Sequence, residues 1–135
     1  MRLVDTNILL YSVSKSPGEN SKREVAQQIL VSSGIAVSVQ VLQEFYWQVT
    51  RPNARYPLSE VERLLIVESL CDGPVQNISI EVFLAAIATA ARYRISYWDA
   101  AIIEAARALG CHTVLSEDLQ HGQNFNGVRV ENPFL

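Results

Sequence analysis

The chain has 135 residues, of which 49% are hydrophobic and 19% are charged, and its mean hydropathy is +0.11. These values exclude a disordered chain, and no apolar run approaches the roughly 20 residues that span a bilayer. The 11 basic and 14 acidic residues give a net charge of −3, which by itself argues against a nucleic-acid partner. We therefore expect one globular domain over residues 1–135, located in the cytoplasm, with no membrane segment.

The first half of the chain alternates short apolar strands with helices. The predicted elements are a strand at 2–5, a helix at 7–13, a helix at about 19–33, a strand at 35–37 and a helix at 39–50. Pro17-Gly18 breaks the chain between the first two helices, and Arg51 to Pro57, with two prolines, forms a loop.

The second half continues the alternation. Ser59 and Glu62 have the spacing of a capping box and open a helix that runs to Cys71. The remaining predicted elements are a weak strand at 75–78, an alanine-rich and largely buried helix at 80–92, a helix at 98–109 capped by Gly110, and strands at 113–115 and 128–130. The pattern predicts an α/β fold, a three-layer α/β/α sandwich with a central, mostly parallel sheet.

The two cysteines, Cys71 and Cys111, lie outside any CxxC or Cys/His spacing. Such cysteines in a cytosolic protein are typically neither disulfide-bonded nor metal ligands. We expect both to be reduced and mostly buried.

Four acidic residues stand near the end of a predicted strand or the start of a predicted helix. They are Asp5, Glu44, Asp99 and Asp118. In a parallel sheet such positions converge on one rim, where α/β proteins bind their ligands. Setting these four aside leaves 10 acidic against 11 basic residues, so the net charge does not exclude RNA.

Carboxylates gathered at one rim raise one another's pKa unless a counter-charge is present. A hard divalent cation such as Mg²⁺ or Mn²⁺ supplies that charge, and it suits hydrolysis of phosphodiester bonds by a metal-activated water. Asn7 and Ser116 are close in sequence to two of the acids and could hold metal-bound waters or orient a carboxylate.

Each acid also has a purely structural interpretation. Asp5 could cap the helix that follows it, and Asp99 has the third position of a capping box opened by Ser96. Glu44 could be a solvated helix residue and Asp118 an ordinary turn residue. The metal-site hypothesis therefore depends on the four acids together.

The chain resembles the PIN domain family, and more narrowly the VapC-type toxin ribonucleases of type II toxin–antitoxin systems. The resemblance is carried, in order, by four short motifs: Asp5-Thr6-Asn7, Gln43-Glu44-Phe45, Trp98-Asp99-Ala100-Ala101-Ile102 and Ser116-Glu117-Asp118-Leu119. It implies Asp5 and Asp99 as principal Mg²⁺ or Mn²⁺ ligands, with Glu44 and Asp118 completing an acidic pocket. The last motif departs from the family pattern, because Gln120 replaces a second acid; this leaves Glu117 as an alternative to Asp118.

The resemblance also implies an activity and partners. It implies a metal-dependent endoribonuclease that cleaves tRNA or another structured RNA, forms a homodimer and is held inactive by a cognate antitoxin. Arg51 and Arg55, interleaved with aromatic residues, and Arg92 and Arg94, upstream of Asp99, are candidates for contacts with the RNA. Solvated arginines or a dimer contact are the alternatives for the first pair. We expect Trp98 to pack in the core.

Two other functions are compatible with parts of the pattern. One is a catalytically inactive PIN-like module that binds RNA or a protein, although such a module has no need of mutually repelling carboxylates. The other is a phosphotransfer protein with Asp5 as the nucleophile, which lacks the lysine near a late strand that this chemistry usually employs.

Overall fold

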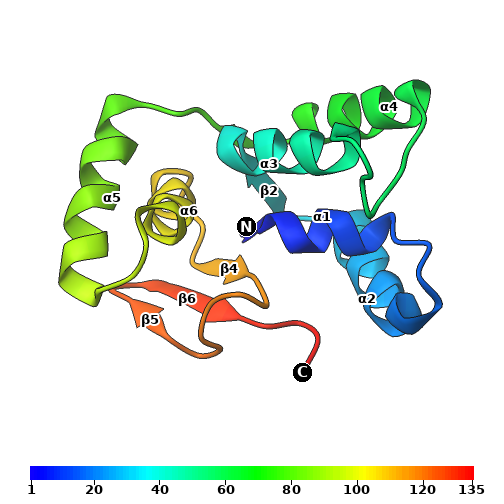
Figure 1. Ribbon diagram of the computed structural model, residues 1–135. Coiled ribbons are helices and arrows are strands. Elements are labelled where there is room, and N and C mark those ends of the chain that lie inside the picture. The colour runs from blue at the N-terminus through cyan, green and yellow to red at the C-terminus, as the bar shows by residue number, and fades with distance from the viewer.

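A computed structural model describes all 135 residues as a central sheet between two layers of helices (Figure 1). The strands are β1 Arg2–Val4, β2 Ile35–Ser38, β3 Val75–Gln76, β4 Thr113–Leu115, β5 Asn124–Phe125 and β6 Val128–Glu131. The helices are α1 Thr6–Ser12, α2 Asn20–Val31, α3 Val39–Thr50, α4 Glu60–Cys71, α5 Ile80–Tyr93 and α6 Tyr97–Ala108, with one 3-10 turn at Pro17–Glu19. No helix is both long enough and apolar enough to cross a membrane.

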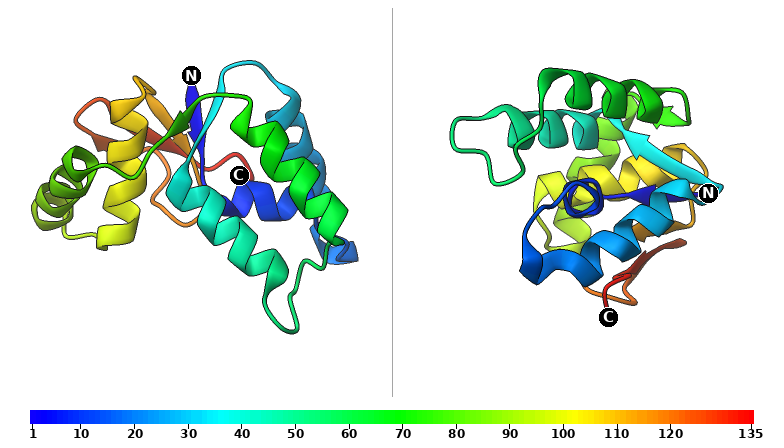
Figure 2. Two further views of the ribbon diagram at one scale, coloured as in Figure 1. Left: turned by 90° about the horizontal axis from the view of Figure 1, so that it is seen from above. Right: turned by 90° about the vertical axis from the view of Figure 1, so that its right-hand side faces the viewer.

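The six strands form one sheet in the order β3-β2-β1-β4-β6-β5. All pairings are parallel except that of β5 with β6. The connections from β1 to β2 and from β2 to β3 step in one direction across the sheet, and the connection from β3 to β4 steps back. Because parallel crossovers are right-handed, α1 to α4 lie on one face and α5 and α6 on the other (Figure 2). The predicted three-layer α/β/α fold is confirmed.

The core lies where the central strands meet the inner helices. Leu3, Val4, Val37, Val114 and Leu115 are almost completely buried in the sheet. On the face of the sheet covered by α5 and α6, the seven consecutive residues from Ala100 to Ala106 of α6 are all buried. The inner strands are therefore apolar on both faces, as expected of strands covered by two helical layers.

Serine caps fix the starts of four helices. In α4 the predicted capping box is present: the Ser59 hydroxyl accepts from the Glu62 amide at 3.2 Å, and the Glu62 carboxylate accepts from the Ser59 amide at 3.0 Å. The Ser38, Ser79 and Ser96 hydroxyls accept in the same way at α3, α5 and α6. These local signals explain why the helix starts agree with the sequence prediction.

Two predictions about burial are wrong, and one strand was not predicted. Helix α5 is not largely buried, since it is the outermost helix of its layer and only Ala86 is fully buried. Cys71 is exposed at the end of α4, whereas Cys111 is buried; both are free thiols, as expected. The two-residue strand β5 was not predicted.

Candidate functional site

Asp5 lies at the centre of the rim formed by the carboxyl ends of β1 and β4. It caps α1, because its Oδ1 accepts from the Thr6 amide at 2.7 Å. Its Oδ2 accepts from the Ser116 hydroxyl at 2.6 Å. The register that pairs Val4 with Leu115 sets Asp5 and Ser116 side by side. Asp5 is only 6% exposed, so its carboxylate is held rigidly at the edge of the core.

Glu44 joins this rim from α3. Its Oε2 accepts from the Thr6 hydroxyl at 2.6 Å, and its Oε1 accepts from the Gln40 side-chain amide at 3.1 Å. The same Gln40 nitrogen donates to the backbone carbonyl of Trp98 at 3.2 Å. Thr6 and Gln40 thus position Glu44 between α1 and the start of α6.

Asp118 reaches the rim from the loop after β4. Its Oδ2 accepts from the Asn7 side-chain amide at 3.0 Å, and its backbone amide donates to the Ser116 hydroxyl at 3.1 Å. The neighbouring Glu117 carboxylate instead forms an ion pair with Lys22 at 2.8 Å and accepts from the Tyr11 hydroxyl. The structure therefore places Asp118 with Asn7 and Ser116, and Glu117 in a separate ion pair.

Asp99 joins the rim from the first turn of α6. Its backbone amide donates to the Ser96 hydroxyl at 3.1 Å, so the expected helix cap is present. The Asp99 side chain forms no hydrogen bond to a residue beyond the start of α6, and the residue is partly exposed. The structural interpretations of Asp5 and Asp99 as capping residues hold alongside their place on the rim.

The four carboxylates interact electrostatically. Burial raises the pKa of Asp5 to about 6; the hydrogen bonds from Ser116 and Thr6 oppose this shift, and the charges of Asp118 and Glu44 add to it. The pKa of Asp99 is also raised, first by burial and then by the charges of Asp118 and Glu44. The negative charges of Asp118 and Glu44 therefore act on both Asp5 and Asp99.

No basic side chain neutralises this rim. The ion pairs of the protein join Lys22 to Glu117, Arg55 to Glu19 and Arg107 to Glu104, and none includes a rim acid. In addition, the Asn7 side-chain oxygen is buried without a hydrogen-bond partner. Unneutralised carboxylates beside an unpartnered amide oxygen form the all-oxygen donor set that suits a hard divalent cation.

The side chains are not gathered into a tight ligand cluster. No group of three or more His, Cys, Asp or Glu side chains is spaced to hold a metal ion. Three of the rim carboxylates are hydrogen-bonded to neutral partners. The donor chemistry of the rim fits Mg²⁺ or Mn²⁺, although its carboxylates do not form a close ligand cluster.

The four candidate arginines do not contact these acids. Arg51 stacks over the Trp47 ring at 5.0 Å and Arg92 over the Tyr93 ring at 5.2 Å. Arg55 pairs with Glu19 at 3.0 Å. Arg94 ends α5 in the left-handed region, with φ of 56°. All four are exposed.

Sequence reasoning missed the roles of Thr6 and Gln40. Thr6 follows the first acid directly, and Gln40 lies one helical turn before Glu44, a spacing at which side chains meet. The expectation for Trp98 was wrong: its side chain is 64% exposed, because it precedes the buried stretch of α6.

The comparisons with known proteins identify the family and the fold of the chain. The family model for the PIN domain matches residues 2–123. A toxin–antitoxin complex from Klebsiella pneumoniae contains a similar chain, with 20% identity, 98% of each chain covered and a TM-score of 0.67. The structure of VapBC2 from Rickettsia felis, bound to a promoter DNA fragment, is similar with 19% identity, 97% of each chain covered and a TM-score of 0.67. The Mycobacterium tuberculosis toxin VapC20, which cleaves the sarcin-ricin loop, is similar with 15% identity and a TM-score of 0.64. The match covers 87% of this chain and 92% of VapC20. No curated protein sequence matches the chain.

Proposed function

Because the chain belongs to the PIN domain family, we propose that it is a Mg²⁺- or Mn²⁺-dependent endoribonuclease. The observation that carries the proposal is the rim of four electrostatically coupled carboxylates without a basic counter-charge. A binding-only module gains nothing from such repulsion, whereas a site for a divalent cation needs these negative charges, and the bound cation neutralises them. In this proposal residues 1–135 act as one nuclease domain in the cytoplasm.

The four acids would contribute to metal binding to different degrees. Asp5 and Asp99, on opposite sides of the rim, would be the principal ligands, and Glu44 and Asp118 would complete the pocket. A divalent ion bound there supplies activation of water for attack on phosphorus and stabilises the charge that develops on the phosphate.

Neutral residues prepare the acids for this role. The Ser116 hydroxyl and the Thr6 amide hold the two oxygens of Asp5, and the Thr6 hydroxyl holds Glu44. Asn7 holds Asp118 through its amide nitrogen, which leaves its buried oxygen facing no protein donor. Such outer partners orient ligands and tune their affinity for metal.

The proposal includes two partners. Similar chains occur in toxin–antitoxin complexes, which supports a cognate antitoxin that restrains a toxic nuclease. A structurally similar toxin cleaves the sarcin-ricin loop, which supports a structured RNA, such as a tRNA, as substrate. The exposed Arg51, Arg55, Arg92 and Arg94 would contact RNA phosphates, and the nuclease would act as a homodimer.

The test is to sequence RNA ends after induced expression of the protein in a bacterial host. We expect growth arrest and new RNA ends at defined sites, and neither with Asp5→Asn. Purified protein should cut the same sites with Mg²⁺ and not after chelation. Equal arrest by wild type and Asp5→Asn, without new ends, would contradict a nuclease and favour a binding module.

A further inference from the structure

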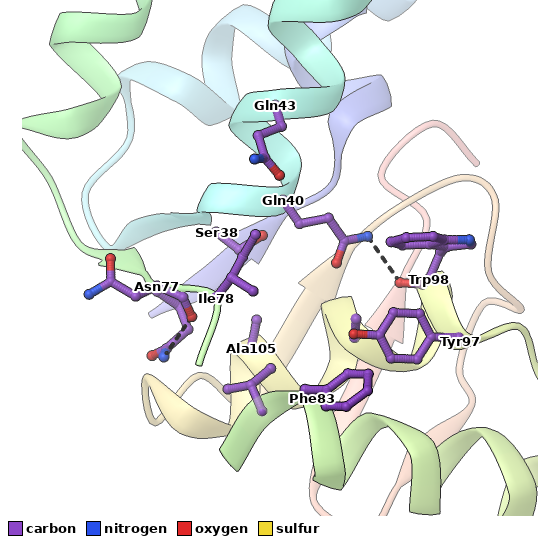
Figure 3. Close-up of a pocket in the computed structure, with 12 residues that line it drawn as sticks. Ser38, Gln40, Gln43, Asn77, Ile78, Phe83, Tyr97, Trp98 and Ala105 are labelled. Carbon is purple, nitrogen blue, oxygen red and sulfur yellow. Dashed lines mark hydrogen bonds between the residues drawn. The ribbon is translucent and has the colours of Figure 1, made fainter. Parts of the chain in front are cut away.

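A second site lies beside the acidic rim. It is a cavity between α3, the end of β3, α5 and the start of α6, with about 460 Å³ of empty space, part of it open to solvent (Figure 3). Its lining contains aromatic rings, amide groups and small apolar side chains, and no charged residue. A site of this composition suits a neutral group better than a phosphate or an ion.

One wall of the cavity is aromatic. Tyr97 packs edge-to-face against Trp98 at 5.0 Å between ring centroids and against Phe83 at 5.8 Å. These contacts fix the orientation of the Trp98 ring, although 64% of that side chain remains exposed. A large flat ring held in place and open to solvent is a surface on which another planar group can stack.

A second wall, formed by α3, offers hydrogen-bonding groups. Gln40 uses its nitrogen to bind Glu44 and the carbonyl of Trp98, so its oxygen is left without a partner. Figure 3 shows that this oxygen and the Tyr97 hydroxyl point into the cavity. Gln43 on the next turn also lines the space, and its amide has no partner in the protein.

The cavity is joined directly to the acids. Gln40 lines the cavity and holds Glu44 with the same amide group, and Trp98 is the residue before Asp99. A group bound in the cavity therefore contacts a residue that is hydrogen-bonded to Glu44 and the residue that precedes Asp99 in the chain. If RNA is cut at the rim, a nucleotide beside the cleaved bond is the part of the substrate that reaches this space.

We propose that the cavity binds one nucleobase of the RNA, stacked on Trp98 and hydrogen-bonded by Gln43, the Gln40 oxygen and the Tyr97 hydroxyl. A nucleobase is planar and neutral and carries donors and acceptors on its edge, which matches both walls. An apolar side chain would leave the amides unpaired. The proposal rests on the ribonuclease function, because it needs RNA at the rim.

The experiment measures RNA affinity by fluorescence anisotropy in a non-cleaving Asp5→Asn background. The probes are short labelled single-stranded RNAs in which one abasic nucleotide is moved through every position. Trp98→Ala should weaken binding of intact RNA roughly 5- to 150-fold, the effect of losing one base–aromatic stack. Trp98→Phe should restore most of the affinity.

The position scan identifies the base. At one position, RNA with the abasic nucleotide should bind the Asp5→Asn protein as weakly as intact RNA binds the same protein with Trp98→Ala added. Combining the abasic nucleotide with Trp98→Ala should then cause no further loss of affinity. Gln43→Ala should weaken binding of intact RNA but not of that abasic RNA. Gln28→Ala, an exposed helical glutamine on α2, is the matched control and should change neither.

The outcomes separate this site from the nuclease. Additive losses at every position would overturn the base site even if wild type cleaves RNA. Non-additivity at one position would support it even if wild type cleaves nothing, in which case the proposed nuclease fails. Unchanged RNA affinity in Trp98→Ala, with a lower molecular mass by sedimentation, would assign the cavity to contact between protein chains and overturn the proposal.

Discussion

The two sides of the acidic rim hold their principal acids in different ways. On the β1 side, Asp5 is 6% exposed and both of its oxygens accept hydrogen bonds, from Thr6 and Ser116. On the α6 side, Asp99 is partly exposed and bonds only within its own helix cap. If the rim binds a cation as proposed, the β1 side is held in place by the protein beforehand, and the α6 side can adjust to the ion.

The largest expected effect is the loss of cleavage when either acid is neutralised. Asp5→Asn and Asp99→Asn should each reduce Mg²⁺-dependent cleavage at least about thousandfold, because the metal contributes several kcal/mol to the transition state. The rates are measured in single-turnover assays on a defined RNA. Circular dichroism should show both variants folded, and substantial activity in either one would refute its role as a ligand.

The pH dependence of the free energy of unfolding should differ between variants of Asp5 and variants of Asp99. The folded-state pKa of Asp5, about 6, lies above its unfolded value of 3.8, so its favourable contribution is complete below pH 4 and is lost as the pH rises through 6. Between pH 3 and 7, without metal, the stability of Asp5→Asn relative to wild type should rise by about 3 kcal/mol. Asp99→Asn should show a smaller change of the same sign.

Urea unfolding at several pH values measures this difference. Addition of Mg²⁺ should stabilise wild type and leave Asp5→Asn unchanged, since the cation would relieve the repulsion. A pH-independent difference between wild type and Asp5→Asn would show that the buried carboxylate does not carry the shifted pKa.

Removal of a positioning hydroxyl should have an intermediate effect. Ser116→Ala takes away the donor to Asp5 and the acceptor for the Asp118 amide, so cleavage should fall about 10- to 100-fold. The Mg²⁺ concentration for half-maximal rate should rise, which simple destabilisation would not cause. Ser12→Ala, on the same helix as Thr6 but bonded to a backbone carbonyl, should leave both values unchanged.

The smallest effect tests which acid of the β4 loop belongs to the site. Glu117→Gln should change the cleavage rate less than tenfold, because its carboxylate is paired with Lys22, and should lower stability by about 1 kcal/mol or less. Asp118→Asn should lower the rate more than Glu117→Gln does. The reverse order of rates would make Glu117 the fourth acid.

Local signals explain what could be predicted from the sequence. The capping box of Ser59 and Glu62 and the strand-end position of Asp5 depend on a few adjacent residues, so they could be recognised without the fold. The Asn126-Gly127 pair also predicts a tight hairpin, and its positive φ values of 50° and 100° form the turn between β5 and β6. This local signal alone is enough to predict the turn.

Burial and side-chain partners could not be predicted in the same way. Helices α5 and α6 are both rich in alanine, yet α6 packs against the sheet and α5 packs mainly against α6, a difference set by topology. The hydrogen bond from Thr6 to Glu44 joins residues 38 positions apart, and the sequence around either residue does not indicate its partner. Long-range partners require the three-dimensional arrangement.

The double use of Asp5 limits which replacements a cell could tolerate at this position. The carboxylate both starts the seven-residue helix α1 and faces the rim. Asparagine retains the side-chain oxygen that caps the helix and removes the charge, whereas alanine loses both. If expression of the protein arrests growth as proposed, a genetic selection for surviving colonies should yield full-length survivors altered at residue 5 that carry Asp5→Asn, and Asp5→Ala should be recovered mainly as degraded protein.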